Sequence, residues 1–347
     1  MTRTATLLGL LVASGACGAC RRGAPGEDDQ RAVPQIAPLP PVDERCDPSR
    51  SRQCIGNDVV ACEPDGTLGR RLQACHEGCD DGECVATCAD DGAQLIYLVD
   101  DANDFMSFDP RKLPRDPFQR IGRLDCGSRH GEPFSMSVDR HGVAWVVYQD
   151  GALFKVSIAD ARCRPTHYQA GSGGFLRFGM GFVSDQPGGK TEKLFVAADD
   201  GSRTLATIDT ASGDTASSLA PRAVGALPAA DEHNPELTGT GDARLFGFYP
   251  ATARPAFVQE IDRATAAPRG PRWSLGKAPL SGVTAYAFAQ WAGVFYVFVT
   301  SLDDEGASSS TVRTVESTTG AARVVLDHLP YHITGAGVST CAPARDQ

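Results

Sequence analysis

The sequence predicts an all-β protein: a five-bladed β-propeller closed by its C-terminal strand and preceded by a small disulfide-rich module. Two observations predict this fold. An apolar, strand-like segment recurs five times, starting at residues 95, 143, 194, 245 and 294, and seven of the twelve cysteines lie between Cys46 and Cys88. Repeats of about 50 residues with several strands each are typical of propeller blades. A short segment dense in cysteines is typical of a unit held by disulfides rather than by a core.

Length and composition exclude several classes of protein. The chain has 347 residues, of which 41% are hydrophobic and 22% charged, and its net charge is −10. This is enough apolar material for more than one domain and too much for a disordered chain. The excess of acidic residues argues against nucleic acid as a partner. It also argues against a protein that binds a membrane surface through clustered basic residues. We expect a monomer that meets the membrane through a lipid anchor only.

The first twenty residues have the features of an export signal. One charge precedes an apolar run from Ala5 to Ala13, which is too short for a transmembrane helix but long enough for a signal-peptide core. Small residues then lead to Cys17 and Cys20, as in bacterial lipoprotein signals, where a cysteine receives the lipid. Residues 1–20 are therefore predicted to be a signal peptide of the lipoprotein type. An ordinary cleaved signal and a retained N-terminus are the alternatives.

The parity of the cysteines bears on which one is lipidated. Lipidation of Cys20 would remove Cys17 with the signal and leave ten cysteines, an even number that can all pair. Lipidation of Cys17 would leave an odd number, although Cys17 lies closer to the apolar run. We therefore expect lipidation at Cys20 and keep Cys17 as the alternative. The expected location is the cell envelope, anchored at the outer membrane, with secretion as the alternative.

Residues 21–45 form a proline-rich stretch, with five prolines and no apolar periodicity. Proline fixes φ and lacks an N–H donor, so this stretch is predicted to be an extended, semi-rigid tether. It would separate the anchored N-terminus from the folded part.

Residues 46–88 are predicted to form the disulfide-rich module. About forty residues cannot bury enough surface to fold on a core alone. Zinc binding by thiolates is the competing interpretation, but an exported chain favours disulfides. Three bridges are expected within the module, and the spacing does not fix their connectivity. The cysteines concerned are Cys46, Cys54, Cys62, Cys75, Cys79 and Cys84.

Each repeat after Cys88 contains four strand-like elements. The second is the apolar segment, and a third follows it, as in FMSFD and LATID. The first has small residues at alternate positions, which suits a strand that faces a crowded centre. Its copies are SMSV at Ser135, GMGF at Gly179, GTG at Gly239, AYAF at Ala285 and GAGV at Gly335. A weaker fourth element closes each unit, near residues 120, 167, 217, 273 and 324.

The order of these elements predicts how the ring closes. The first repeat lacks its first strand, and a matching segment, residues 333–340, stands near the C-terminus. We therefore expect this segment to complete the first blade of a domain that spans residues 89–343, with residues 344–347 as a tail. Closure would remove the free sheet edges that promote aggregation.

Two disulfides are expected on the propeller. Cys341 ends the C-terminal strand and Cys88 lies shortly before the first apolar strand, so their Cα atoms should come within the ~4.4–6.8 Å of a disulfide. This Cys88–Cys341 clasp would tie the closure covalently. Elimination then pairs Cys126 with Cys163. Strand direction argues against that second pair, because it puts Cys126 at the bottom of the ring and Cys163 near the top.

The segments LTGTGDARLFGF, AYAFAQWAGVFYVF and ITGAGVSTCAP, together with the cysteine module, resemble a family of exported bacterial lipoproteins. Its members join a Cys-rich module to a propeller-like repeat and are largely uncharacterised. The resemblance covers most of residues 46–343. It implies the architecture described above and carries no catalytic residues.

No segment shows a catalytic constellation, so no catalytic, cofactor-binding or metal-binding residue is assigned. The segment from Ser137 to Trp145 resembles the Asp-box hairpin of sialidases. We instead expect Asp139 and Gly142 to shape a tight turn, with Trp145 packed between blades. The seven histidines are scattered, and nucleophile, zinc-protease and P-loop motifs are missing. Calcium is the one cofactor left open, at acidic clusters around residues 100–104, 199–200 and 303–305.

The leading functional hypothesis is a non-enzymatic binding protein of the cell envelope, with an unknown protein or glycan ligand. It follows from a ligand-presenting architecture without a recognisable catalytic site. The alternative is a hydrolase or lyase that acts on a glycan or peptide in the propeller channel, and a structural envelope spacer is the second alternative. A channel lined by carboxyls with raised pKa values would favour the enzyme. A channel filled by small and apolar side chains would favour the binder.

Overall fold

The computed structural model describes residues 45–75, 78–80, 82–84, 88, 91–126, 131–228, 235–303 and 305–344. The predicted signal peptide (residues 1–20), the lipidation candidates Cys17 and Cys20, and the tether up to residue 44 lie outside the described residues. No helix within the described ranges is both long and apolar enough to cross a membrane.

The N-terminal module is a small β unit with three disulfides. Strands β1 (Arg52–Ile55), β2 (Asp58–Cys62) and β3 (Leu68–Ala74) form one sheet, and β4 (Cys79–Asp80) pairs with β5 (Glu83–Cys84). Its few buried apolar side chains include Val59 and Val60. Covalent bridges therefore replace most of a core, as expected for so short a unit. The pairs are Cys46–Cys62, Cys54–Cys79 and Cys75–Cys84.

The rest of the described chain forms five four-stranded antiparallel sheets. From inner to outer strand they are β25 (Ile333–Val338), β6 (Ile96–Asp100), β7 (Asp104–Phe108) and β8 (Phe118–Arg123); β9 (Pro133–Val138), β10 (Val143–Tyr148), β11 (Leu153–Ser157) and β12 (Cys163–Pro165); β13 (Phe178–Ser184), β14 (Glu192–Ala198), β15 (Thr204–Ile208) and β16 (Arg222–Ala226); β17 (Glu236–Gly239), β18 (Leu245–Tyr249), β19 (Phe257–Ile261) and β20 (Pro268–Ser274); and β21 (Val283–Trp291), β22 (Val294–Leu302), β23 (Ser308–Glu316) and β24 (Ala322–Leu329). The helices of the described residues are short 3₁₀ turns, such as η1 (Asp91–Gln94) and η2 (Pro110–Lys112).

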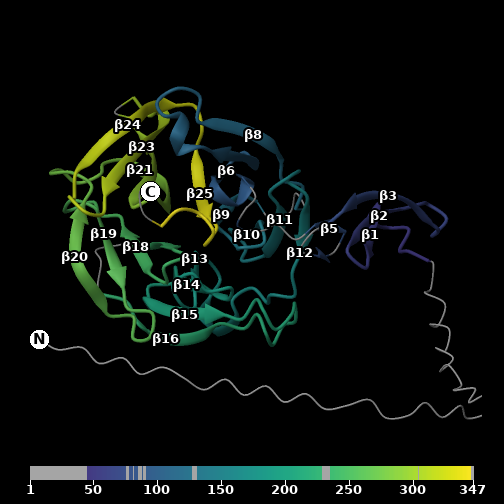
Figure 1. The fold of residues 1–347 in the computed structure, drawn as a ribbon. Coiled ribbons are helices and arrows are strands. Elements are labelled where there is room, and N and C mark those ends of the chain that lie inside the picture. Colours follow the sequence, from purple (N-terminus) through teal and green to yellow (C-terminus); the bar gives the residue numbers. More distant parts are fainter. Residues whose placement is uncertain are drawn as a thin grey trace, which may run out of the picture. The chain divides into compact units, whose positions relative to one another are not determined.

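The sheets stand around a common centre, as in a propeller (Figure 1). The inner strands contact one another in the order β25, β9, β13, β17, β21 and back to β25. The C-terminal strand β25 pairs with β6, with Ala336 opposite Leu98, so the last strand of the chain completes the first sheet. The prediction of an all-β, propeller-like chain is therefore confirmed.

Close packing of the inner strands explains their small residues. A Cβ added at Gly337 would lie 2.8 Å from the Cα of Ser137 on the neighbouring sheet, and one at Gly181 would lie 3.0 Å from the Cα of Thr238. A side chain at Gly337 would force the backbone of the neighbouring strand to move, and one at Gly181 would fit only if its neighbour gave way slightly, so glycine suits the places where these backbones meet. The alternating small residues of the sequence therefore reflect how closely neighbouring inner strands approach one another.

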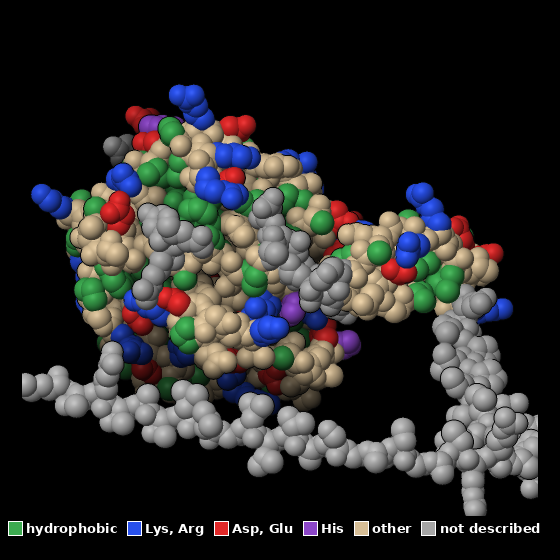
Figure 2. Space-filling model, in the orientation of Figure 1, with side chains coloured by type: hydrophobic (Ala, Val, Ile, Leu, Met, Phe, Trp, Pro, Cys, Tyr) green, Lys and Arg blue, Asp and Glu red, His purple; other side chains and the backbone are tan. Residues whose placement is uncertain are grey.

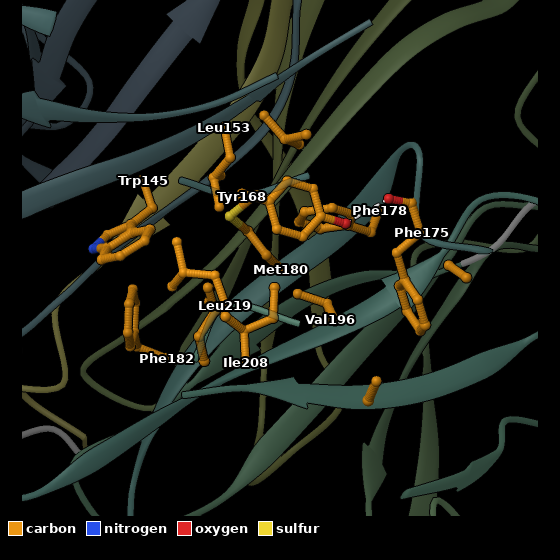
Figure 3. Close-up of a cluster of buried hydrophobic side chains, with 14 residues drawn as sticks. Trp145, Leu153, Tyr168, Phe175, Phe178, Met180, Phe182, Val196, Ile208 and Leu219 are labelled. Atoms are coloured by element: carbon orange, nitrogen blue, oxygen red, sulfur yellow. Dashed lines mark hydrogen bonds between the residues drawn. The ribbon is translucent and has the colours of Figure 1, made fainter. Parts of the chain in front are cut away.

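Apolar side chains fill the space between neighbouring sheets. In the cluster of Figure 3, Trp145 and Leu153 meet Phe182, Val196 and other side chains of the next sheet. The rings of Trp145 and Phe182 lie edge to face with centroids 6.1 Å apart. The expected position of Trp145 between two sheets is therefore observed. On the face drawn in Figure 2, acidic and basic side chains lie interspersed around this apolar interior.

Two of the predicted outer strands lie elsewhere than expected. Strand β16 begins at Arg222, after the predicted segment near Ser217, because local hydrogen bonds make a turn there. The Ser218 backbone N–H donates to the Thr215 hydroxyl at 3.1 Å, and the Ser218 hydroxyl donates to the Gly213 carbonyl at 2.5 Å. Such side chain to backbone bonds compete with a sheet ladder. Strand β12 likewise ends at Pro165, before the predicted segment near residue 167.

Both propeller disulfides are present. Cys88 and Cys341 have Cα atoms 4.8 Å apart, and those of Cys126 and Cys163 are 5.0 Å apart. The argument from strand direction against the second pair is wrong because it ignored sheet twist. Twist of about 20–25° per strand turns the outermost strand toward the neighbouring sheet. A Cβ at Gly122, near the end of β8, would accordingly lie 2.9 Å from the Cβ of Ala161, just before β12.

Replacing Cys88 and Cys341 together by Ser should lower the free energy of unfolding by about 2–5 kcal/mol, because the unfolded chain loses a constraint between residues 253 positions apart. The matched control replaces Cys126 and Cys163, which are 37 positions apart. Because the control's disulfide closes a shorter loop, its removal should lower the free energy of unfolding by about 2 kcal/mol less. Urea unfolding without reductant measures both. A control loss as large as that of the clasp would contradict this account of the closure.

Candidate functional site

A buried carboxyl group, Glu236, lies where the inner strands begin. Glu236 is the first residue of β17 and is only 3% exposed. The Ser135 hydroxyl on β9 donates a short hydrogen bond to its Oε1, and the backbone N–H of Met180 on β13 donates to the same carboxyl. Burial raises the pKa of Glu236 well above its ordinary value, and the two donors offset only part of this. Glu236 therefore keeps its proton to a much higher pH than an exposed glutamate.

Gly179 on β13 makes room for this carboxyl. A Cβ at Gly179 would lie 3.0 Å from both the Cα and the Oε2 of Glu236, and 2.5 Å from the carbonyl oxygen of Pro235. A side chain at this position would therefore push the start of β17 away from β13. The small residue of one sheet thus sets the position of the acid on the next.

Asp199 supplies a negative charge beside Glu236. It directly follows β14, and its charge raises the pKa of Glu236 further. The Asp199 carboxylate pairs with the Arg177 guanidinium at 3.1 Å. Arg177 also donates to Oε1 of Gln149 at 3.1 Å and lies over the ring of Phe134. Since Arg177 is held on several sides, it fixes the position of the Asp199 carboxylate.

Tyr286 on β21 completes the group. Burial raises the pKa of its hydroxyl, and the negative charges of Glu236 and Asp199 act in the same direction. Its ring meets the ring of Phe248 edge to face, with centroids 5.8 Å apart. The phenol therefore stays protonated close to both carboxyl groups. Side chains or backbone from four of the five sheets meet at this place.

The arrangement places two carboxyl groups in different surroundings. Glu236 is buried and holds its proton, whereas Asp199 is ion-paired and has a side chain 26% exposed. Pairs of carboxyls whose surroundings push their pKa values apart can act as proton donor and charged partner in one reaction. The site can therefore give a proton to a leaving group while it stabilises positive charge or activates water.

The Asp-box-like segment forms a turn, as the sequence analysis expected. The Asp139 carboxylate accepts from the backbone N–H groups of His141 and Val143, both at 2.9 Å, and from Nε1 of Trp145 at 3.1 Å. Gly142 has φ +73°, the left-handed conformation that such a turn needs.

Of the acidic clusters considered for calcium, the one at residues 100–104 makes several local contacts. The Asp104 N–H donates to Asp100 at 2.7 Å, Arg120 pairs with Asp104 at 2.7 Å, and the His332 imidazole lies 3.0 Å from Asp101. Within the described ranges, no three His, Cys, Asp or Glu side chains gather closely enough to hold a metal ion.

Sequence reasoning missed Glu236 and used Asp199 only as a calcium candidate. The signal that could have revealed Glu236 was the correct register of the small-residue motif. The third copy of the motif was placed at Gly239, but β17 starts at Glu236 and sets it beside Gly179 of β13. A glutamate thus occupies a position where neighbouring copies have glycine or serine. An ionisable group in such a crowded place is a marker of function.

No family model matches the chain, and no curated protein matches it. Similar solved structures include the computationally designed protein Ika8, with 16% identity, 82% of this chain and 76% of that chain covered, and a TM-score of 0.29. A GH43 endo-arabinanase from Bacillus licheniformis has 17% identity, covers 58% and 78%, and has a TM-score of 0.36. An exo-β-1,3-galactanase from Phanerochaete chrysosporium has 10% identity, covers 61% and 53%, and has a TM-score of 0.41. At these values the likeness assigns no residue and no activity.

The leading hypothesis of a non-enzymatic binding protein is corrected. Several of the similar solved structures are glycoside hydrolases. In this chain, a buried carboxyl with a raised pKa also lies among the inner strands, rather than only the small and apolar side chains expected of a binder.

Gly179→Ala should displace Glu236 and shift its titration, because the new methyl group would overlap Pro235 and Glu236. The matched control is Gly181→Ala, whose methyl group would meet the backbone of Thr238 two residues further along the same pair of strands. Both should cost about 1–3 kcal/mol of stability through overpacking. Carboxyl ¹³C NMR of labelled glutamate follows the titration. An equal shift in both variants, or in neither, would count against the role assigned to Gly179.

Proposed function

We propose that this protein hydrolyses glycosidic bonds, with Glu236 as the proton donor and Asp199 as the charged carboxylate. The observation that carries the proposal is the pairing of a buried, proton-holding glutamate with an ion-paired aspartate at the starting ends of the inner strands. Glycoside hydrolysis needs one carboxyl in each state, because the leaving oxygen must be protonated while the sugar carbon becomes positively charged.

The proposed reaction breaks the bond between the sugar's anomeric carbon and the bridging oxygen. Glu236 gives its proton to that oxygen, which leaves as a hydroxyl group. A water molecule adds its oxygen to the anomeric carbon and gives one proton to Asp199. Proton exchange with solvent then restores both carboxyl groups. The negative charge of Asp199 also stabilises the positive charge that develops on the sugar ring.

Three neighbouring residues would position these groups. The hydrogen bond from Ser135 holds the carboxyl of Glu236 in one orientation. Arg177 fixes Asp199 through an ion pair, and the side chains of Arg177 and Asp199 are 39% and 26% exposed. The protonated phenol of Tyr286 on β21 lies near both carboxyl groups and closes the site on that side.

The architecture that supports this site is a five-bladed propeller. The support is the cyclic order of contacts among β25, β9, β13, β17 and β21, with each inner strand leading one of the five four-stranded sheets. In such a ring, the starting ends of the inner strands converge on the axis, which brings residues far apart in sequence to one site.

The proposed setting is outside the cytoplasm. Five disulfides join the ten described cysteines, and disulfides persist in oxidising compartments. Export with a lipid anchor at Cys20 or Cys17 is part of the same proposal. Its substrate would then be a glycan of the envelope or of the surroundings.

The test is release of reducing ends by the purified full chain from a panel of plant and bacterial polysaccharides and aryl glycosides. Glu236→Gln should lower kcat/KM by about 10²–10⁴-fold, because the amide has no proton to give. Asp199→Asn should lower it by a similar factor. Activity of the unaltered protein should fall as pH rises through the raised pKa of Glu236, since only the protonated form is a donor.

The control is Asp200→Asn, which removes an exposed carboxylate next to Asp199. The Asp200 side chain accepts from the Ser202 N–H in a turn and is outside the proposed machinery. This variant should keep full activity. The proposal fails if the unaltered chain releases no sugar from any substrate, or if Glu236→Gln retains activity while folding normally.

A further inference from the structure

The Cys88–Cys341 clasp differs from the other disulfides in its exposure to solvent. Among the ten cysteines that the structure describes, Cys88 alone is exposed. Its partner Cys341 is half-buried, and Cys126 of the second propeller disulfide is only 7% exposed. Thiol–disulfide exchange requires that a thiolate reach one of the two sulfur atoms, so access selects which disulfide reacts and at which sulfur. A thiolate from solvent therefore meets Cys88 first.

A cationic side chain lies against this exposed sulfur. The Arg140 guanidinium is 3.6 Å from Sγ of Cys88 and donates a hydrogen bond to the carbonyl of Gly189 at 2.7 Å. The second contact holds the guanidinium beside the disulfide. Positive charge at this place attracts an anionic thiolate and stabilises the negative charge that sulfur carries during exchange. Arg140 therefore favours attack at Cys88.

The backbone of Arg140 faces the other sulfur of the clasp. Its carbonyl oxygen lies 3.6 Å from Sγ of Cys341. When attack at Cys88 releases Cys341, the new thiol has this carbonyl as an acceptor for its S–H group. One residue thus contacts both sulfurs, with its side chain beside the one that is attacked and its backbone beside the one that leaves.

Hydrogen bonds hold the C-terminal segment in place independently of the disulfide. Glu192, the first residue of β14, accepts from the Thr340 hydroxyl at 2.6 Å and from the Arg140 backbone N–H at 2.7 Å, in the turn between β9 and β10. Its carboxyl group thus joins three sheets next to the clasp. Beyond the clasp, the Pro343 carbonyl accepts from the Ala292 N–H at 2.6 Å. These contacts keep one half of the clasp in position when the disulfide is cut.

We propose that the clasp is a reversible, thiol-operated fastening of the ring closure. A dithiol opens it by attack at Cys88, and an oxidant restores it while the hydrogen bonds around Thr340 keep the closing strand in place. The clasp follows β25 at the finishing ends of the inner strands, whereas Glu236 lies at a starting end. The fastening is therefore separate from the proposed glycosidase site and does not depend on the proposed hydrolysis.

The exchange proceeds in two balanced steps. A thiolate of the dithiol attacks Sγ of Cys88 and forms a mixed disulfide, while the bond between the two cysteine sulfurs breaks and Cys341 leaves as a thiolate that takes up a proton. The second sulfur of the dithiol then attacks the first, closes a cyclic disulfide and releases Cys88, which takes up the second proton. The dithiol loses two electrons and two protons, and the clasp gains both.

The first test measures which disulfide of the unaltered, folded chain is reduced first. Dithiothreitol is added to the native protein, free thiols are alkylated at intervals, and peptide mass spectrometry follows each pair. The clasp should open about tenfold faster than Cys126–Cys163. With a monothiol, the mixed disulfide should form on Cys88 and the alkylated thiol on Cys341. Earlier opening of any other disulfide, or a mixed disulfide on Cys341, would overturn the proposal.

The second test addresses the charge of Arg140. Opening rates of the clasp are compared for an anionic thiol, mercaptoethanesulfonate, and a cationic thiol, cysteamine, each relative to its rate with a small-molecule disulfide. Arg140→Gln should lower the anionic-to-cationic ratio about three- to tenfold. The matched control Arg222→Gln, which removes an exposed charge on β16, should keep the ratio. Mere loosening of the turn would speed both thiols alike, so an unchanged ratio in Arg140→Gln would contradict the proposed attack at Cys88.

The third test concerns reversal. A chain in which only the clasp is cut should stay folded, and oxidised glutathione should restore the Cys88–Cys341 pair. Thr340→Val removes the hydroxyl donor to Glu192 and should slow this recovery about three- to tenfold. Unfolding of the chain as soon as the clasp alone is cut would show a permanent staple instead of a reversible fastening, and would end the proposal.

Discussion

The distance between the inner strands is the constraint on which the rest of the structure depends. Neighbouring inner strands approach so closely that Gly337 has no space for a Cβ and Gly181 has little. This approach lets large side chains, such as Trp145 and Phe182, fill the wider space farther from the centre. It also leaves few positions near the axis where a functional side chain can stand. The site is therefore determined as much by where glycine makes room as by where a carboxyl is placed.

Much of the fold could be predicted from the sequence because similar strands pack in every sheet, so similar apolar segments recur along the chain. The apolar strands recur with β10, β14, β18 and β22, and the segment that forms β25 is the one missing from the first repeat. What could not be predicted were relations across sheets. The Cys126–Cys163 pair depends on the twist that accumulates across a sheet. The order of strands along the sequence does not show how large this twist is.

The candidate site was harder to predict for the same reason. Glu236, Ser135 and Asp199 come from three sheets and are 37 to 101 positions apart, as the bond between Ser135 and Glu236 illustrates. No local motif joins them, so a search for short catalytic patterns finds nothing. A shift of three residues in aligning one small-residue motif was enough to hide Glu236. Register, which decides the face and height of every side chain in a strand, is the weakest part of a sequence-based alignment.

A buried carboxyl group also loses hydration, which lowers the stability of the fold and bears on the role of the group. Glu236 and Glu192 both lie where an apolar or small side chain would pack without the loss of hydration that an acid suffers. Each carboxyl accepts hydrogen bonds from donors on other sheets. One hydroxyl and one N–H nevertheless stabilise it less than full hydration would. Such groups weaken a fold, so their presence points to a use for their proton or their contacts. At the starting ends of the inner strands, that use is the retained proton of Glu236 in the proposed hydrolysis. At the finishing ends, Glu192 accepts from the Arg140 backbone N–H and the Thr340 hydroxyl, and so joins three sheets next to the clasp. The two carboxyls therefore differ in role because of what they contact: one holds a proton at the proposed site, and the other ties neighbouring sheets together where the ring closes.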